Sequence, residues 1–214
     1  MRTHIKFCGC TSARDAHEAV EAGVDAIGVI FAVASPRCVS LPTAREIAQA
    51  VPALTSLVGV FVEPNAAQVS AALAVGYLPQ FSGNESAAAC ECATRAAYIK
   101  VFHVVPDCAS GPDPAAFERA AQPYVRATWM FDSAADGKHG GTGRPFDWKI
   151  ARALAGNRRF IISGGLTAEN VGACIRQLRP YGVDVRSGIE TGGVKDLAKM
   201  RAFVRAVKEA DAQA

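Results

Sequence analysis

The sequence has little charge imbalance and no long apolar run. Its 214 residues carry a formal net charge of +3 without a Lys/Arg-rich block, so the electrostatic signature of a nucleic-acid-binding protein is missing. No apolar run approaches the ~18 residues of a membrane span. His4 and Lys6 interrupt the N-terminal stretch in which a signal peptide would need its apolar core. We therefore expect no nucleic-acid partner and no membrane attachment.

Cysteine occurs in an odd number and without the spacing of a metal site. The seven cysteines include no Cys-x-x-Cys pair, the spacing typical of structural zinc sites. Cys8 and Cys10 would point to one side of a strand and could chelate a metal, whereas Cys90 and Cys92 fall on a predicted helix and face apart. We expect reduced thiols, a cytoplasmic protein and no metal.

Short β-branched or aromatic runs alternate with Ala-rich amphipathic stretches along the whole chain. The candidate strands are residues 3–9, 25–31, 54–62, 76–83, 97–104, 126–133, 159–165 and 183–190. A helical stretch follows each, with a mean repeat of about 27 residues, which predicts parallel strands joined by right-handed crossovers. Eight such units close into a (β/α)8 TIM barrel, here a single domain over residues 1–214. An open doubly wound sheet is the alternative, but its G-x-G-x-x-G fingerprint is missing after the first strand.

Several helical stretches open with a side chain that accepts hydrogen bonds from the amides of a first turn. These side chains are Ser12, Thr43, Asn65, Asp113 and Thr167. Such residues satisfy donors that have no partner inside the helix, so we expect them to be N-caps.

The barrel prediction places function at the carboxyl ends of the strands. The last two strands end in ISGGL and RSGIE, where glycines let backbone amides approach an anion closely. The loops after these strands commonly hold phosphate in such barrels. We predict that Gly164, Gly165, Ser187 and Gly188 bind phosphate; the alternative is that the glycines only form tight turns.

A thiol and a carboxyl group end two other strands. Cys8 and Asp132 would face one cavity and act as general base and general acid, although a free cysteine is also a common core residue. Arg37, in the loop 34–40, suits a forked contact with a carboxylate, or is simply a solvated loop residue. The longest βα loop, 133–146, is glycine-rich, as expected of a mobile cover over a site.

Seven segments along the whole chain are informative when they are taken together. They read KFCGCTSARDA, AVEAGVDAIGVIF, SPRCVS, GVFV, GGTGRPFDW, ISGGLTAENV and VDVRSGIE. In this order they resemble the phosphoribosylanthranilate isomerase family of tryptophan biosynthesis. The opening K-x-C-G and the later GGTG-x-x-FDW separate this family from other phosphate-binding barrels.

The resemblance implies an Amadori rearrangement of N-(5-phosphoribosyl)anthranilate to 1-(2-carboxyphenylamino)-1-deoxyribulose 5-phosphate. It implies that Asp132 protonates the furanose ring oxygen and that Cys8 removes the C2′ proton of the resulting Schiff base. It also implies that Arg37 pairs with the anthranilate carboxylate and that Asp184 lies near the bridging nitrogen. No cofactor is required, because the iminium itself is the electron sink. Nothing suggests a large apolar interface, so a monomer is expected.

Several positions depart from the family pattern. The fourth strand ends in QFSG where the family usually reads QLHG, so Ser82 replaces a histidine, and Pro79 removes a backbone donor from an interior strand. The eighth strand carries Arg186 instead of a small hydroxyl residue. By alternation Arg186 shares a face with Asp184, and a buried pair between them could neutralise Asp184. Three alternatives stay open: a barrel that binds a sugar phosphate without turnover, a metal or redox sensor, and a related sugar-phosphate isomerase.

Overall fold

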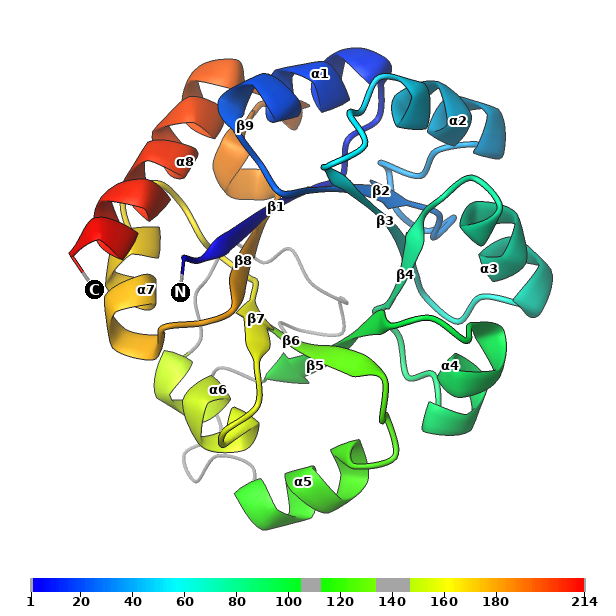
Figure 1. The fold of residues 1–214 in the computed structure, drawn as a ribbon, viewed down its shortest axis with the longest axis vertical. Helices are drawn as coiled ribbons and strands as arrows, with labels where there is room; N and C mark the ends of the chain where they lie inside the picture. The colour runs from blue at the N-terminus through cyan, green and yellow to red at the C-terminus, as the bar shows by residue number, and fades with distance from the viewer. Residues whose placement is uncertain (1, 105–112, 134–146, 214) are drawn as a thin grey trace.

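The chain forms a closed barrel of eight parallel strands surrounded by helices (Figure 1). The computed structural model describes residues 2–104, 113–133 and 147–213. Strands β1 to β8 are His4–Cys8, Ala26–Ile30, Ser56–Phe61, Leu78–Phe81, Tyr98–Val104, Ala127–Ser133, Phe160–Ile162 and Gly182–Val185. Each strand pairs with the next, and β1 closes the barrel against β8 with Lys6 opposite Asp184. The predicted (β/α)8 barrel is confirmed.

Helices follow the strands and cover the outside of the barrel (Figure 1). Helices α1 to α8 are Ala13–Ala22, Leu41–Gln49, Ala66–Leu73, Ala87–Ala93, Pro114–Ala121, Trp148–Ala155, Val171–Leu178 and Leu197–Ala212. Within the described ranges, no helix combines the length and the apolar character needed to cross a membrane.

The predicted helix starts are partly confirmed. Ser12, Asn65 and Asp113 are N-caps that accept hydrogen bonds from first-turn amides. The prediction for Thr43 was wrong: Ser40 caps α2 and accepts from the Thr43 amide at 3.2 Å. Pro42 suits the first turn of a helix because its missing N–H needs no partner there, so α2 begins before Thr43. Thr167 also lies outside its helix.

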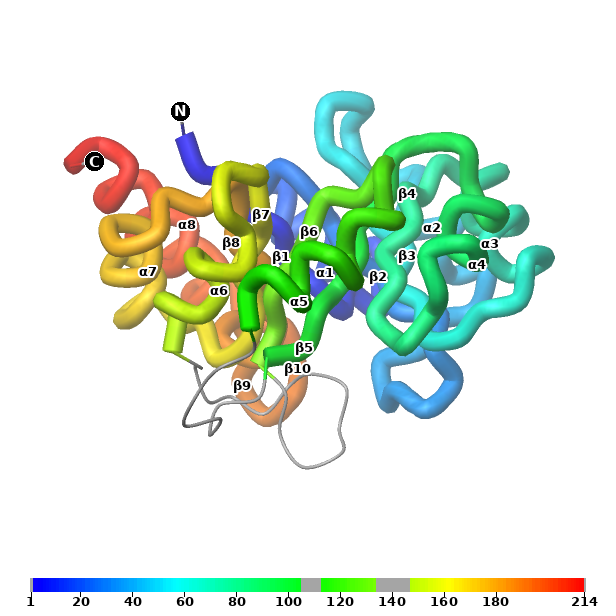
Figure 2. Tube along the Cα trace, turned by 90° about the horizontal axis from the view of Figure 1, so that it is seen from below, coloured from blue at the N-terminus to red at the C-terminus, as the bar shows by residue number. Residues whose placement is uncertain are grey.

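The last predicted strand, 183–190, is shorter in the structure. It ends at Val185, and a 3-10 helix, Ser187–Ile189, and two short strands, β9 (Glu190–Thr191) and β10 (Val194–Lys195), follow. Figure 2 shows this extra hairpin at the end of the molecule opposite the two chain termini. It therefore adds side chains next to the carboxyl end of β8.

Alternation along each strand separates the barrel interior from the layer between strands and helices. Cys8 packs inside with Ile30 and Val60, whereas Cys10 belongs to the outer cluster. The prediction that both sulfurs share one side was wrong, because β1 ends at Cys8 and Gly9 turns the chain with a φ of 76°. A two-sulfur chelate of these cysteines is not formed.

The proline of the fourth strand is accommodated in the sheet. Pro79 lies in β4 opposite Gly59 of β3. The ladder between β4 and β5 begins only at Gln80, after the proline. The departure at Pro79 therefore leaves the barrel closed.

Candidate active site

A cavity of about 120 Å³ opens at the carboxyl end of the barrel. Every strand, or the loop that follows it, contributes to its lining. The predicted residues in this lining are Cys8, Asp132, Asp184, Gly164, Gly165 and Ser187. The fold thus brings together six of the eight predicted site residues. Arg37 and Gly188 lie outside the lining.

The Cys8 side chain lies at the wall of this cavity and is only 6% exposed. Burial raises the pKa of its thiol, and Asp184 raises it further, whereas the cations of Lys6, Lys195 and Arg186 lower it. A thiolate at this position therefore depends on the three surrounding cations. Because its pKa is raised, Cys8 favours the protonated thiol in the free protein.

Asp132 lies at the end of β6, on the cavity side. Burial raises the pKa of its carboxyl group, and the charge of Asp184 adds to the shift, against the opposing effect of His103. The Ser163 hydroxyl lies 3.2 Å from Asp132 Oδ1 and 3.4 Å from Asp184 Oδ2. A carboxyl group with a raised pKa keeps its proton longer, as a general acid requires.

The buried partner of Asp184 is Lys6, not Arg186. Lys6 Nζ donates to Asp184 Oδ1 at 2.7 Å, and both side chains are almost fully buried. Burial opposes the charge of Lys6, but Asp184 and Cys8 raise its pKa. The predicted Arg186–Asp184 pair was wrong because β1 is the neighbour of β8 in the closed barrel. Lys6 precedes Cys8 by two positions, so alternation alone could have placed it inside the barrel.

The glycines among the predicted phosphate-binding residues allow close packing at the ends of neighbouring strands. Gly164 and Gly165 have φ values of 88° and 65°, a region that favours glycine. A Cβ atom at Gly164 would lie 2.7 Å from Asp132 Oδ1, and one at Gly188 would overlap the carbonyl oxygen of Leu166. A side chain at Gly164 would thus collide with the end of β6, and a side chain at Gly188 would collide with the loop after β7.

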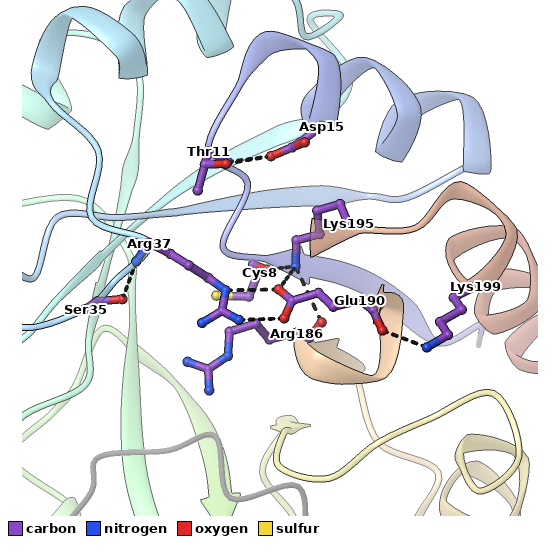
Figure 3. A network of polar contacts seen from close by, with 9 residues as sticks. All are labelled: Cys8, Thr11, Asp15, Ser35, Arg37, Arg186, Glu190, Lys195 and Lys199. Atoms are coloured by element: carbon purple, nitrogen blue, oxygen red, sulfur yellow. Dashed lines mark hydrogen bonds and ion pairs between the residues drawn. The ribbon is translucent and has the colours of Figure 1, made fainter. Parts of the chain in front are cut away.

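Arg37 is held beside the cavity by an acid that the sequence analysis did not identify. Its Nε and Nη2 donate to the Glu190 carboxylate at 3.1 and 2.6 Å. Lys195 Nζ donates to the same carboxylate at 2.8 Å and to the Cys8 carbonyl oxygen at 2.6 Å, as Figure 3 shows. Arg37 and Glu190 are 153 positions apart, and no sequence spacing signals this contact. The role of Arg37 in substrate binding stays a prediction.

An imidazole borders the cavity although the family's histidine is replaced by Ser82. His103, at the end of β5, lines the cavity, and its Nε2 lies 2.8 Å from the Ser82 carbonyl oxygen. The two strands thus hold a histidine ring next to the position of the replacement.

Two further expectations concern metal binding and the glycine-rich loop. In residues 2–104, 113–133 and 147–213, no group of three or more His, Cys, Asp or Glu side chains is placed to hold a metal ion. The predicted mobile cover, 133–146, lies outside the described residues except for Ser133.

The fold and the site define a class: a (β/α)8 barrel with a thiol, a carboxyl group and glycine turns around one cavity at the carboxyl ends of its strands. Comparison with known proteins identifies one enzyme family within this class. The model of the family described as N-(5'phosphoribosyl)anthranilate (PRA) isomerase matches residues 5–206. The N-(5'-phosphoribosyl)anthranilate isomerase of Halorhodospira halophila is 42% identical over 214 residues, 99% of each chain. That of Pseudomonas aeruginosa is 40% identical over 207 residues, 95% of this chain and 94% of the relative.

Solved structures agree with the sequence relatives. The crystal structure of phosphoribosyl anthranilate isomerase from Thermotoga maritima superposes with a TM-score of 0.82 at 31% identity, and the match covers 97% of this chain and 99% of that one. A second isomerase structure, in complex with reduced 1-(o-carboxyphenylamino)-1-deoxyribulose 5-phosphate, has a TM-score of 0.77 at 30% identity over 97% and 99% of the chains. The chain belongs to the N-(5'-phosphoribosyl)anthranilate isomerase family, whose members are enzymes of tryptophan biosynthesis.

Proposed function

We propose that the chain converts N-(5-phosphoribosyl)anthranilate to 1-(2-carboxyphenylamino)-1-deoxyribulose 5-phosphate, with Asp132 as general acid and Cys8 as general base. The observation that carries the assignment of residues is that both side chains line one cavity together with Gly164, Gly165 and Ser187. An acid and a base must reach the same sugar from fixed positions, and the closed barrel holds both on rigid strands.

In the first step Asp132 donates its proton to the furanose ring oxygen. The bond between C1′ and this oxygen breaks, and the nitrogen lone pair forms the iminium. The raised pKa of Asp132, caused mainly by burial, favours the protonated carboxyl group that the step consumes. The product of this step is an open-chain Schiff base with a positive charge on nitrogen.

In the second step Cys8 takes the C2′ proton as its thiolate. The electron pair of that C–H bond moves into the iminium and gives an enolamine, which tautomerises to the ketone. We assign Asp184 to the region of the bridging nitrogen, where its carboxylate, shared with Lys6 at 2.7 Å, would stabilise the positive charge. The Gly164, Gly165, Ser187 and Gly188 segments would hold the phosphate through backbone amides.

Replacement of the two proposed catalytic groups tests the assignment. Cys8→Ser and Asp132→Asn should each lower kcat by about 100- to 10,000-fold, the usual contribution of acid–base catalysis, as measured by the loss of substrate fluorescence. Cys92→Ser is the matched control, because Cys92 is an exposed thiol on α4. Near-normal turnover in both variants would reject the assignment, and binding without turnover in the wild type would instead identify a sugar-phosphate-binding barrel.

We also propose a monomer in the cytoplasm. The large hydrophobic side chains that are well exposed in the described residues are Val33, Leu54, Val125 and Val194. The first three lie on separate connecting segments, and Val194 lies in β10. No disulfide joins the cysteines of the described segments, which suits a reducing compartment. Light scattering at several protein concentrations measures the mass, and a dimer at all concentrations would contradict the proposal.

A further inference from the structure

Several arginines line a hollow at the amino end of the barrel, opposite the candidate active site. The hollow has a volume of about 470 Å³ and lies between the carboxyl ends of α6, α7 and α8 and the starts of β1, β7 and β8. In Figure 2 the start of β1 and the end of α8 lie opposite the hairpin of β9 and β10. The arginines come from four separate segments, so no basic block in the sequence marks them. The lining of this arginine hollow includes Arg2, Arg152, Arg158, Arg159 and Arg179.

The arginine hollow carries more positive than negative charge. Among the described residues that line it, the acid is Asp211, and both of its carboxylate oxygens accept hydrogen bonds from Thr3. Arg2 is paired with Asp25. In the described part of the chain, the other four arginines have no carboxylate within ion-pair distance. Five arginines thus face two aspartates, and the surplus of three charges equals the formal net charge of the whole chain.

Two of these arginines are held by aromatic rings instead of acids. The Arg158 guanidinium lies 4.7 Å from the centre of the Trp129 ring. The Arg159 guanidinium lies 5.7 Å from the centre of the Tyr181 ring. A guanidinium over a ring keeps N–H donors at the edge of its plane, where a phosphate can accept them in forked geometry. The attraction of helix carboxyl ends for cations does not account for Arg158 and Arg159, because both lie between α6 and β7.

We propose that the arginine hollow binds an anion with two or more linked phosphate groups. Single exposed charges are screened by water and salt, so four open guanidinium groups favour a ligand that engages several of them at once. The volume of the hollow lies within the range of small-molecule sites. Trp129 is buried and Arg159 already lies over Tyr181, so neither ring is available to stack on a nucleobase. The phosphate groups are therefore the part of the ligand that is recognised.

Isothermal titration calorimetry with sodium tripolyphosphate tests the proposal. At low salt the wild type should bind tripolyphosphate about 10-fold or more tightly than inorganic phosphate, and added salt should weaken the binding. Arg152→Gln combined with Arg179→Asn should weaken Kd by about 10-fold or more, because hydrogen bonds from charged donors are lost. Asparagine suits position 179, where φ is 46°. The matched control combines Arg45→Gln with Arg119→Gln, at exposed positions of α2 and α5, and should leave Kd unchanged.

The titration must also separate the arginine hollow from the phosphate site proposed at the catalytic end. It is therefore repeated with saturating reduced 1-(o-carboxyphenylamino)-1-deoxyribulose 5-phosphate, which should leave the affinity for tripolyphosphate unchanged. Competition between the two compounds, or equal effects of the two double variants, would overturn the proposal. Hexaglutamate that binds as tightly as tripolyphosphate would indicate a surface for acidic polypeptides and overturn it as well.

A second variant covers the case in which the double variant does not fold, as melting temperatures would show. Arg159→Lys keeps the positive charge and removes the planar fork, so it should weaken Kd for tripolyphosphate by about 3-fold or more. An unchanged Kd in Arg159→Lys would count against the forked contact. None of these outcomes depends on turnover of phosphoribosylanthranilate, so they are separable from the test of the proposed function.

Discussion

At Asp132 and Cys8, burial shifts both pKa values upward with opposite consequences for the reaction. A raised pKa keeps Asp132 protonated, which an acid needs, but it also keeps Cys8 protonated, which a base must overcome. Nearby cations oppose the rise in the pKa of Cys8, because they stabilise its thiolate. Lys6 and Arg186 lie on the same inward face as Cys8 and lower the pKa of its thiol.

The buried charge of Asp132 should reduce the stability of the protein at neutral pH. Its pKa in the folded state is raised above the ordinary value of 3.8, so the native state binds more protons than the unfolded state between these two values. The free energy of unfolding then falls as pH rises through this window. Asp132→Asn should therefore have a higher Tm than the wild type at pH 7, and the difference should shrink below about pH 4.

Asp25 is the control for this prediction, because its pKa is shifted in the opposite direction. Burial opposes its ionisation, but hydrogen bonds from Arg2 and the Ile5 amide lower its pKa below the ordinary value. Its ionised form therefore stabilises the folded state at neutral pH, and that stability is lost as pH falls. Asp25→Asn should lower Tm at pH 7. If Asp132→Asn also lowers Tm at pH 7, the ionised carboxylate of Asp132 does not destabilise the folded state.

At the scale of elements, the proposed phosphate-binding end depends on how closely two loops approach. The loops after β7 and β8 meet where Gly188 packs against Leu166, and a single added methyl group would overlap a carbonyl oxygen there. This contact was not visible in the sequence, which indicated only two glycine turns. The two turns meet because β7 and β8 are neighbours in the barrel.

Gly188→Ala should separate these two loops. We expect KM for the substrate to rise by about 10-fold or more, because a displacement near 1 Å already disturbs a positioned site. The measurement is steady-state kinetics, with competition by inorganic phosphate as a second readout. Gly188→Ala with an unchanged KM and phosphate inhibition would show that these loops do not bind phosphate.

At the scale of the whole molecule, the two ends of the chain are tied together beside the closing strands. Asp211, near the end of α8, accepts from the Thr3 amide and the Thr3 hydroxyl at 2.7 Å each. These bonds fasten the last helix to the start of β1, whose other neighbour across the closure is β8. The C-terminal helix therefore holds the start of the strand that ends at Cys8.

Asp211→Ala should remove both bonds and leave the Thr3 amide without its charged acceptor. We expect a loss of about 1–3 kcal/mol in the free energy of unfolding, measured by urea unfolding with an unchanged slope. Glu209→Ala, at an exposed position of the same helix, is the control and should change stability by about 0.5 kcal/mol or less. Equal effects of the two substitutions would mean that the tie contributes nothing.

The sequence by itself determined the order of strands and helices, the barrel, the family and the residues at the strand ends. Hydrophobic alternation and repeat length are local properties, so they can be recognised in the sequence alone. Cys8, Asp132, Gly164, Gly165 and Ser187 line one cavity, as expected from the sequence, because strand ends in a parallel barrel must converge.

Only the tertiary structure decided which charges meet. Lys6 rather than Arg186 pairs with Asp184, and Glu190 holds Arg37. Ion pairs depend on register and on the path of side chains over several ångströms, and neither property is local in the sequence.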